Sequence, residues 1–266
     1  MSDLIKINKY AEEIEKLLRL KTPPIGVKFI KSEDEIPPDA VRPKKDRGEH
    51  LAQCQAFAMS RREGKTVAIL REDQWCWAPL IAYGLVDSDA INFDRDDIDP
   101  QMKEMLKWTK ELADKLPSLE TGKYIGLVSA PLTSCTFIPD AVLIYSNNAQ
   151  LRSMLMALKF RPGYAVETDL EPFDSCVYAV VPVFLKGKYR VTFPDPGEYE
   201  RAMVGEDKVI FSLPADKLEE YTDALKDLNK MGQGYTGLKK AMKPDFERPE
   251  FYDVIFETAG LDTGRK

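Results

Sequence analysis

Four cysteines are the residues best able to do chemistry in this 266-residue chain, namely Cys54, Cys76, Cys135 and Cys176. Histidine occurs once, as His50, so metal sites that need two or three histidines of one chain are excluded. No two cysteines are separated by only two residues, which excludes a zinc ribbon, a thioredoxin motif and a bacterial ferredoxin run. Four cysteines do match the ligand number of an iron–sulfur cluster, or of an all-thiolate zinc site as the alternative.

The local setting of three of these cysteines favours a binding site. Cys54 falls in the first turn of a helix predicted over residues 51–62, where the helix dipole stabilises a thiolate. Cys76 lies between two tryptophans, whose indoles would exclude water from a metal centre. Cys176 follows the sequence EPFDS at another predicted junction between a loop and an apolar segment. We therefore expect Cys54, Cys76 and Cys176 to converge as ligands, with Cys135 as the candidate for a fourth.

Other interpretations of the same residues remain open. Free cysteines are commonly small buried hydrophobic residues without a ligand. Cys54 or Cys76 could instead act as a thiolate, with His50 nearby, in a metal-free enzyme or small-molecule-binding protein. A structural or regulatory binding protein without chemistry is a third reading. Six basic residues flank the Cys54 segment: Arg42, Lys44, Lys45, Arg47, Arg61 and Arg62. They would steer an anionic substrate or balance the charge of a negative cluster, or they are ordinary surface charges.

The elements that must position the cysteines mix strands and helices without strict alternation. Hydrophobic patterns predict strands at residues 23–30, 66–70, 123–132, 140–146 and 208–214. They predict helices at residues 5–20, 51–62, 77–85, 100–116, 148–160 and 215–231. This order predicts an α+β fold with a mixed sheet rather than a Rossmann or TIM fold. Neither a dinucleotide-binding glycine motif nor a phosphate loop follows any of the strands.

Two segments of the chain resemble each other. CQAFAMSRREGKTVAIL starts at Cys54 and CVYAVVPVFLKGKYRVTF starts at Cys176, and a predicted strand precedes each. We interpret this as an internal duplication, although cysteine-headed apolar segments and Gly-Lys turns also occur by chance. Pro182 would kink or break a helix in the second segment. The domain prediction is one α+β domain over residues 1–235 with two related halves, about 20–120 and 121–215, and a C-terminal extension at 236–266.

Composition restricts the class of protein. Apolar residues make up 44% and charged residues 31% of the chain, and the net charge is -6. An acidic chain without a basic block is a poor partner for nucleic acid or an anionic membrane. The charged N-terminus and the absence of a long apolar run predict a cytoplasmic protein, whose thiols stay reduced. A redox or electron-transfer role in anaerobic metabolism follows as a hypothesis, with a redox partner protein and a homodimer as candidate assemblies.

The stretch LAQCQAFAMSRREGKTVAILREDQWCWAPLIAYGL is similar to the uncharacterised ArCR family, the archaeal cysteine-rich proteins with domain of unknown function 169. The residues that match its first motif are Cys54, Gly64, Lys65, Thr66, Cys76, Gly84 and Leu85. The residues that match its later strand and turn are Phe137, Pro139, Asp140, Val142, Asn147, Ala149 and Gln150. Cys176 and DKVIFSLPADKLEEYTDAL fit the later segments, so the resemblance extends over about residues 14–228.

The chain departs from this family pattern in two places. Cys76-Trp77-Ala78-Pro79 stands where the family usually has Cys-Pro-Gly-Gly. The stretch VTFPDPGEYERA contains no cysteine, although the family often has one there. The resemblance therefore implies a fold and cysteine positions, and it implies no particular reaction.

Overall fold

The computed structural model of the chain describes residues 3–161, 166–168, 171–237, 250–262 and 264. Within these residues one seven-stranded sheet has the order β2-β3-β1-β4-β7-β6-β5. The strands are β1 (Ile25–Ile30), β2 (Val67–Leu70), β3 (Gly126–Pro131), β4 (Ala141–Asn147), β5 (Val166–Glu167), β6 (Tyr189–Thr192) and β7 (Lys208–Pro214). The paired strands are antiparallel except β5 and β6, which are parallel. The α+β class with a mixed sheet is therefore confirmed.

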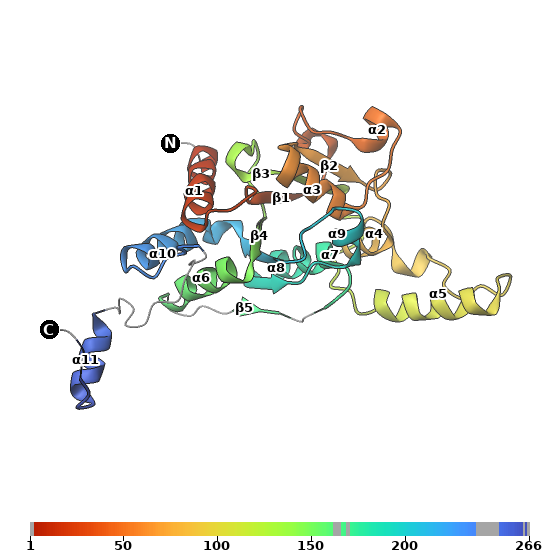
Figure 1. Cartoon of the computed structure of the whole chain (residues 1–266). Helices are drawn as coiled ribbons and strands as arrows, with labels where there is room; N and C mark the ends of the chain where they lie inside the picture. Colours follow the sequence, from red (N-terminus) through yellow and green to blue (C-terminus); the bar gives the residue numbers. More distant parts are fainter. Residues whose placement is uncertain (1–2, 162–165, 169–170, 238–249, 263, 265–266) are drawn as a thin grey trace.

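Helices lie on both faces of the sheet (Figure 1). They are α1 (Asp3–Leu18), α2 (Pro43–Arg47), α3 (Gln53–Glu63), α4 (Trp77–Ala82), α5 (Pro100–Ala113), α6 (Asn148–Lys159), α7 (Ser175–Tyr178), α8 (Val181–Lys186), α9 (Pro196–Glu200), α10 (Leu218–Lys230) and α11 (Phe251–Thr258). One core packs α1, α6 and α10 on the sheet, and a second core packs α3, α4, α7 and α8 on the other face. Side chains of the central strands alternate between these cores, as the two-residue period of a strand requires: in β4, Ile144 enters the first core and Leu143 the second.

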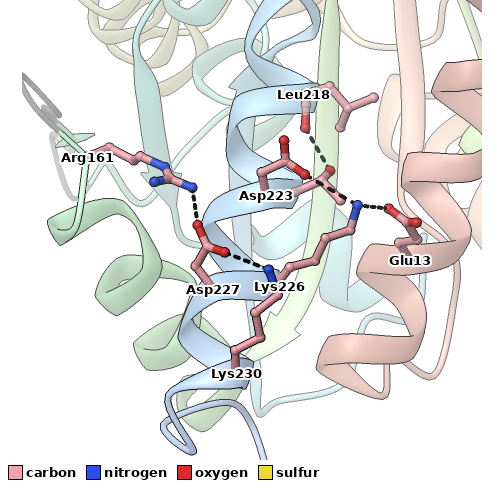
Figure 2. Close-up of polar contacts among 8 residues, drawn as sticks. Glu13, Arg161, Leu218, Asp223, Lys226, Asp227 and Lys230 are labelled. Carbon is pink, nitrogen blue, oxygen red and sulfur yellow. Dashed lines mark hydrogen bonds and ion pairs between the residues drawn. The ribbon is translucent and has the colours of Figure 1, made fainter.

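Helix α10 is fixed to both of its neighbours by ion pairs (Figure 2). The Lys226 ammonium lies 2.6 Å from a Glu13 carboxylate oxygen of α1. The Arg161 guanidinium, just after α6, lies 2.9 Å from an Asp227 carboxylate oxygen of α10. These pairs are partly exposed, so burial of the apolar helix faces contributes most of the stability of this layer.

Local sequence signals account for several element boundaries. Gly64 ends α3 with φ at 69°, a conformation that glycine adopts without strain. Asn147 begins α6, where its side chain accepts a hydrogen bond from the Gln150 N–H and Gln150 completes a capping box. Pro100 is in the first turn of α5, as predicted. The short helices α2 and α9 and the strand β5 were not predicted, because none of them is long enough to show a hydrophobic period.

The two cysteine-headed segments fold similarly but not identically. The first is the single helix α3, whereas the second is divided into α7 and α8, with Pro182 in the first turn of α8. Read inward from one edge of the sheet, the strand order is β2-β3-β1. Read inward from the other edge, the order after the edge strand β5 is β6-β7-β4, so β1 and β4 occupy corresponding places at the centre. Ile25 of β1 pairs with Pro131 of β3, and Ala141 of β4 pairs with Pro214 of β7. Strand order alone does not establish descent from one repeat, so the duplication stays a prediction.

The C-terminal part of the predicted extension is seen as α11, and no residue of this helix is buried. Residues 238–249 of the extension lie outside the described residues, so its boundary at 236 is not tested. Among the described helices, none has the length and apolar character needed to cross a membrane.

Candidate functional site

One cavity brings together three of the four cysteines. It has a volume of about 330 Å³, and Cys54, Cys76 and Cys176 all line it. Cys54 is the second residue of α3, Cys76 immediately precedes α4, and Cys176 is the second residue of α7. Three segments that are far apart in sequence therefore each place a cysteine at the same cavity.

Hydrogen bonds hold these three segments in place. Leu51, just before α3, forms a parallel bridge with Gln74, two residues before Cys76. The buried Tyr83 hydroxyl donates to the Cys176 carbonyl oxygen at 3.0 Å, which ties the end of α4 to α7. Because these contacts hold the backbone near each cysteine, the fold fixes the relative positions of the three segments.

The wall of the cavity is aromatic. All three tryptophans of the chain, Trp75, Trp77 and Trp108, line it together with Phe173. Trp108 and Phe173 meet edge to face with their ring centroids 5.8 Å apart. Trp75 is 69% exposed at the rim and contacts His50, with 4.5 Å between the ring centroids and 34° between the ring planes. His50 therefore supports the rim, and it is not among the residues that line the cavity.

The charged residues that line the cavity are Asp174, Asp195 and Arg201. Asp195 is fixed, because its carboxylate accepts hydrogen bonds from the Ser175 N–H at 2.7 Å and from the Ser175 hydroxyl at 3.0 Å. Asp174 adopts a left-handed backbone conformation with φ at 57°. Burial, followed by the nearby Asp195, raises the pKa of Asp174 to about 6.

These three polar residues were missed at the sequence level. Asp195 carries a detectable signal, since Asp followed by Pro is typical of a helix start, and Asp195 does cap α9. The position of Asp195 near Cys176 depends on the path of the chain between α8 and α9, and no local sequence pattern predicts that path.

Burial keeps the cysteine thiols protonated. It raises the pKa of Cys54, and the Glu198 carboxylate raises it further. Burial also raises the pKa of Cys76 and of Cys176, with Asp174 as the next cause for Cys76 and Asp195 for Cys176. A positive ion between the sulfurs would reverse this preference by stabilising the thiolates and releasing their protons. Without one, these thiols are weak nucleophiles.

Cys135 lies elsewhere. It is 2% exposed in the core that packs α1, α6 and α10, and its thiol donates to the Phe137 carbonyl oxygen at 3.1 Å. Burial raises the pKa of Cys135 to about 11. Cys135 is not among the residues that line the cavity, so within this chain the structure does not bring it to the other three as a fourth ligand.

The basic residues predicted near Cys54 do not reach the cavity either. Arg42 is buried and pairs with Asp73 at 3.1 Å and with Glu72 at 2.6 Å. Arg61 and Arg62 line a different cavity, at the other end of α3. Arg201, which the sequence did not single out, is the cation beside the thiols. Among the described residues, no group of three or more His, Cys, Asp or Glu side chains is already arranged to hold a metal ion.

Comparisons with known proteins agree with this description at the level of the family. An uncharacterized protein of Methanocaldococcus jannaschii is 23% identical over 226 residues, which cover 84% of this chain and 95% of that protein. No solved structure gives a significant match. The family profile described as Uncharacterised ArCR matches residues 13–224, close to the extent over which the sequence resemblance was noted. The chain therefore belongs to the Uncharacterised ArCR family.

Proposed function

We propose that the cysteine cavity binds an iron–sulfur cluster, or a related thiolate-held metal, through Cys54, Cys76 and Cys176. The observation that carries this proposal is that three cysteines from three separate segments line one cavity. A single ion held by thiolates lies about 2.3 Å from each sulfur and needs no cavity of its own. The space between these segments is about 330 Å³, which favours a larger group such as a cluster.

The surroundings suit a redox centre. Aromatic side chains surround the cavity, and Arg201 offsets part of the negative charge of a thiolate-held cluster. Three cysteines leave one metal position without a protein thiolate, open to a carboxylate, solvent or a substrate. When bound, the cluster would supply electron transfer or Lewis acidity. We propose that it acts in a reductive step of anaerobic metabolism in the cytoplasm. A redox partner would approach over the exposed rim at Trp75 and Trp108.

The test is metal analysis of anaerobically purified and reconstituted protein. We expect iron and sulfide in the wild type with a broad visible absorbance, and loss of both in Cys54→Ser, Cys76→Ser and Cys176→Ser. Cys135→Ser is the matched control and should retain the iron, since its thiol lies in the opposite core. Zinc without sulfide would select the zinc alternative. Wild-type protein that binds neither metal, or a Cys135→Ser variant that loses as much iron as the others, would refute the proposal.

A metal-free small-molecule site is the second candidate function. The cavity falls within the range of about 300–1,000 Å³ typical of small-molecule sites, and aromatic side chains line it. The raised thiol pKa values favour binding over nucleophilic catalysis in this alternative.

The predicted homodimer is tested separately. Size-exclusion chromatography coupled to light scattering, on the metal-loaded and the metal-free protein, measures the mass of the assembly.

A further inference from the structure

A second cavity lies at the other end of α3 and is strongly cationic. Its volume is about 220 Å³, and it lies where the C-terminal part of α3 meets the loop before β1 and the ends of β4 and β7. Five basic side chains line it: Arg19, Lys21, Arg61, Arg62 and Lys208. No carboxylate is among the described residues that line this cavity. This concentration of positive charge is notable in a chain whose net charge is -6.

Arg61 is the most buried of these five basic residues. It is only 6% exposed, and its Nε and Nη2 atoms are buried without a hydrogen-bond partner among the described residues. Its guanidinium lies over the Tyr145 ring, 4.3 Å from the ring centroid. A buried guanidinium that lacks hydrogen bonds is unfavourable unless something compensates it, because burial removes its water.

The carboxylate of Glu198 could compensate the charge of Arg61, but it already has another hydrogen-bond partner. Glu198 accepts a hydrogen bond from the Tyr145 hydroxyl at 2.6 Å. Burial raises the pKa of Glu198 to about 7, so at neutral pH this carboxyl is ionised only part of the time. Arg61 therefore faces the cavity with its charge incompletely balanced by the protein.

Hydrogen bonds and enforced backbone conformations fix two of the segments that line this cavity. Gln150 donates from its side-chain amide to the carbonyl oxygens of Leu18 and Arg19, at 2.9 and 3.2 Å. Arg62 donates to the Met203 carbonyl oxygen at 3.3 Å. Arg19 and Met203 are two of the three non-glycine residues with positive φ, at 50° and 49°, among the described residues, and both line this cavity. Such conformations are unfavourable and persist where the surrounding structure enforces them.

We infer that this cavity binds a small anion through a phosphoryl group, either inorganic phosphate or a short phosphate monoester. Guanidinium groups match the geometry of phosphate oxygens, and several cations around one centre suit a dianion better than a single carboxylate. A volume of about 220 Å³ lies below the range of about 300–1,000 Å³ for drug-sized ligands, which excludes a nucleotide enclosed in the cavity. This inference does not depend on metal binding at the cysteines.

The experiment is titration calorimetry with inorganic phosphate, in chloride buffer of constant ionic strength. Lys21 and Arg62 are exposed, so Lys21→Gln and Arg62→Gln should fold normally. Each is expected to weaken phosphate binding about tenfold, the size of one lost charge-assisted contact. Lys45→Gln and Arg47→Gln are matched controls on α2 with the same change in charge, and they should alter the affinity less than about twofold.

Three further measurements complete the test. Arg61→Gln, if it folds by circular dichroism, should abolish binding; the exposed variants decide the question if it does not fold. Glycerol phosphate that binds more tightly than inorganic phosphate would identify an ester as the ligand, and the reverse order would identify the free ion; either result supports a phosphoryl site. No phosphate binding by the wild type at about 10 mM would overturn the inference. Equal losses in the α2 controls, or acetate binding as tight as phosphate, would also overturn it.

Discussion

Replacing Glu198 with glutamine should make the stability of the protein less dependent on pH. Glu198 belongs to α9, is 0% exposed, and has one carboxylate oxygen bonded to Tyr145 and the other without a partner. Burial raises its pKa to about 7 from the ordinary value of 4.5, although the Tyr145 hydrogen bond opposes this shift. Glutamine keeps the shape and an oxygen acceptor for Tyr145, but it cannot ionise.

The sign and size of the effect follow from proton linkage. Between about pH 4.5 and pH 7 the folded protein keeps a proton on Glu198 that the unfolded chain has already released. The contribution of the protonated carboxyl to stability is therefore complete below about pH 4.5 and is lost as pH rises through 7. Raising the pKa of Glu198 from 4.5 to about 7 corresponds to roughly 3 kcal/mol of stability at full ionisation. Glu198→Gln should be close to the wild type at pH 4.5 and more stable by up to roughly 3 kcal/mol at pH 8.

Urea unfolding of the metal-free, reduced protein at pH 4.5, 6 and 8 measures this difference. Glu200→Gln is the matched control, since Glu200 is exposed on the same helix and loses the same charge. Its free energy of unfolding should follow that of the wild type at each pH. If the difference between Glu198→Gln and the wild type is the same at all three pH values, Glu198 ionises normally in the folded protein and the reasoning is refuted.

Three other variants or measurements test parts of the fold and site. Asp73→Asn should lower the free energy of unfolding by about 3 kcal/mol in urea, because it leaves the buried Arg42 without its fully buried partner, whereas Glu72→Gln should cost less than about 1 kcal/mol. Asn147→Ala should cost about 1 kcal/mol by removing the cap of α6, and Asn148→Ala, with no capping bond, should cost little by the same assay. Metal loading should quench most of the tryptophan fluorescence, since all three tryptophans line the cysteine cavity; an unchanged emission spectrum in iron-loaded protein would place the metal elsewhere.

The sequence predicted the parts of this fold that depend on local chemistry. The strands around Ile25–Ile30 and Ala141–Asn147 follow from runs of buried apolar residues. The end of α3 and the start of α6 follow from a glycine and an asparagine in positions where they satisfy the backbone. The sequence also singled out Cys54, Cys76 and Cys176, because each precedes or begins an apolar segment.

What the sequence could not supply was the arrangement of residues across segments. Cys135 was the candidate for a fourth ligand, yet it follows β3 and enters the core on the other face of the sheet. Asp174 and Arg201 line the cysteine cavity only because α7 and α9 pack beside α3 and α4. Arg61 follows Cys54 closely in sequence, but a helix of 11 residues is long enough to place the two at different cavities.

The proposed metal site and the proposed phosphate site bind different ligands, but helices α3 and α9 connect them. Helix α3 carries Cys54 at its start and Arg61 near its end, and α9 packs beside it with Glu198. The positive charge of Arg61 lowers the pKa of Glu198, and the charge of Glu198 raises the pKa of Cys54. An anion that neutralises Arg61 would thus favour a protonated Glu198, and a neutral Glu198 would favour the Cys54 thiolate that a metal needs. Any such coupling is reciprocal, so phosphate and metal would each strengthen binding of the other, with Glu198 as the residue that transmits the effect.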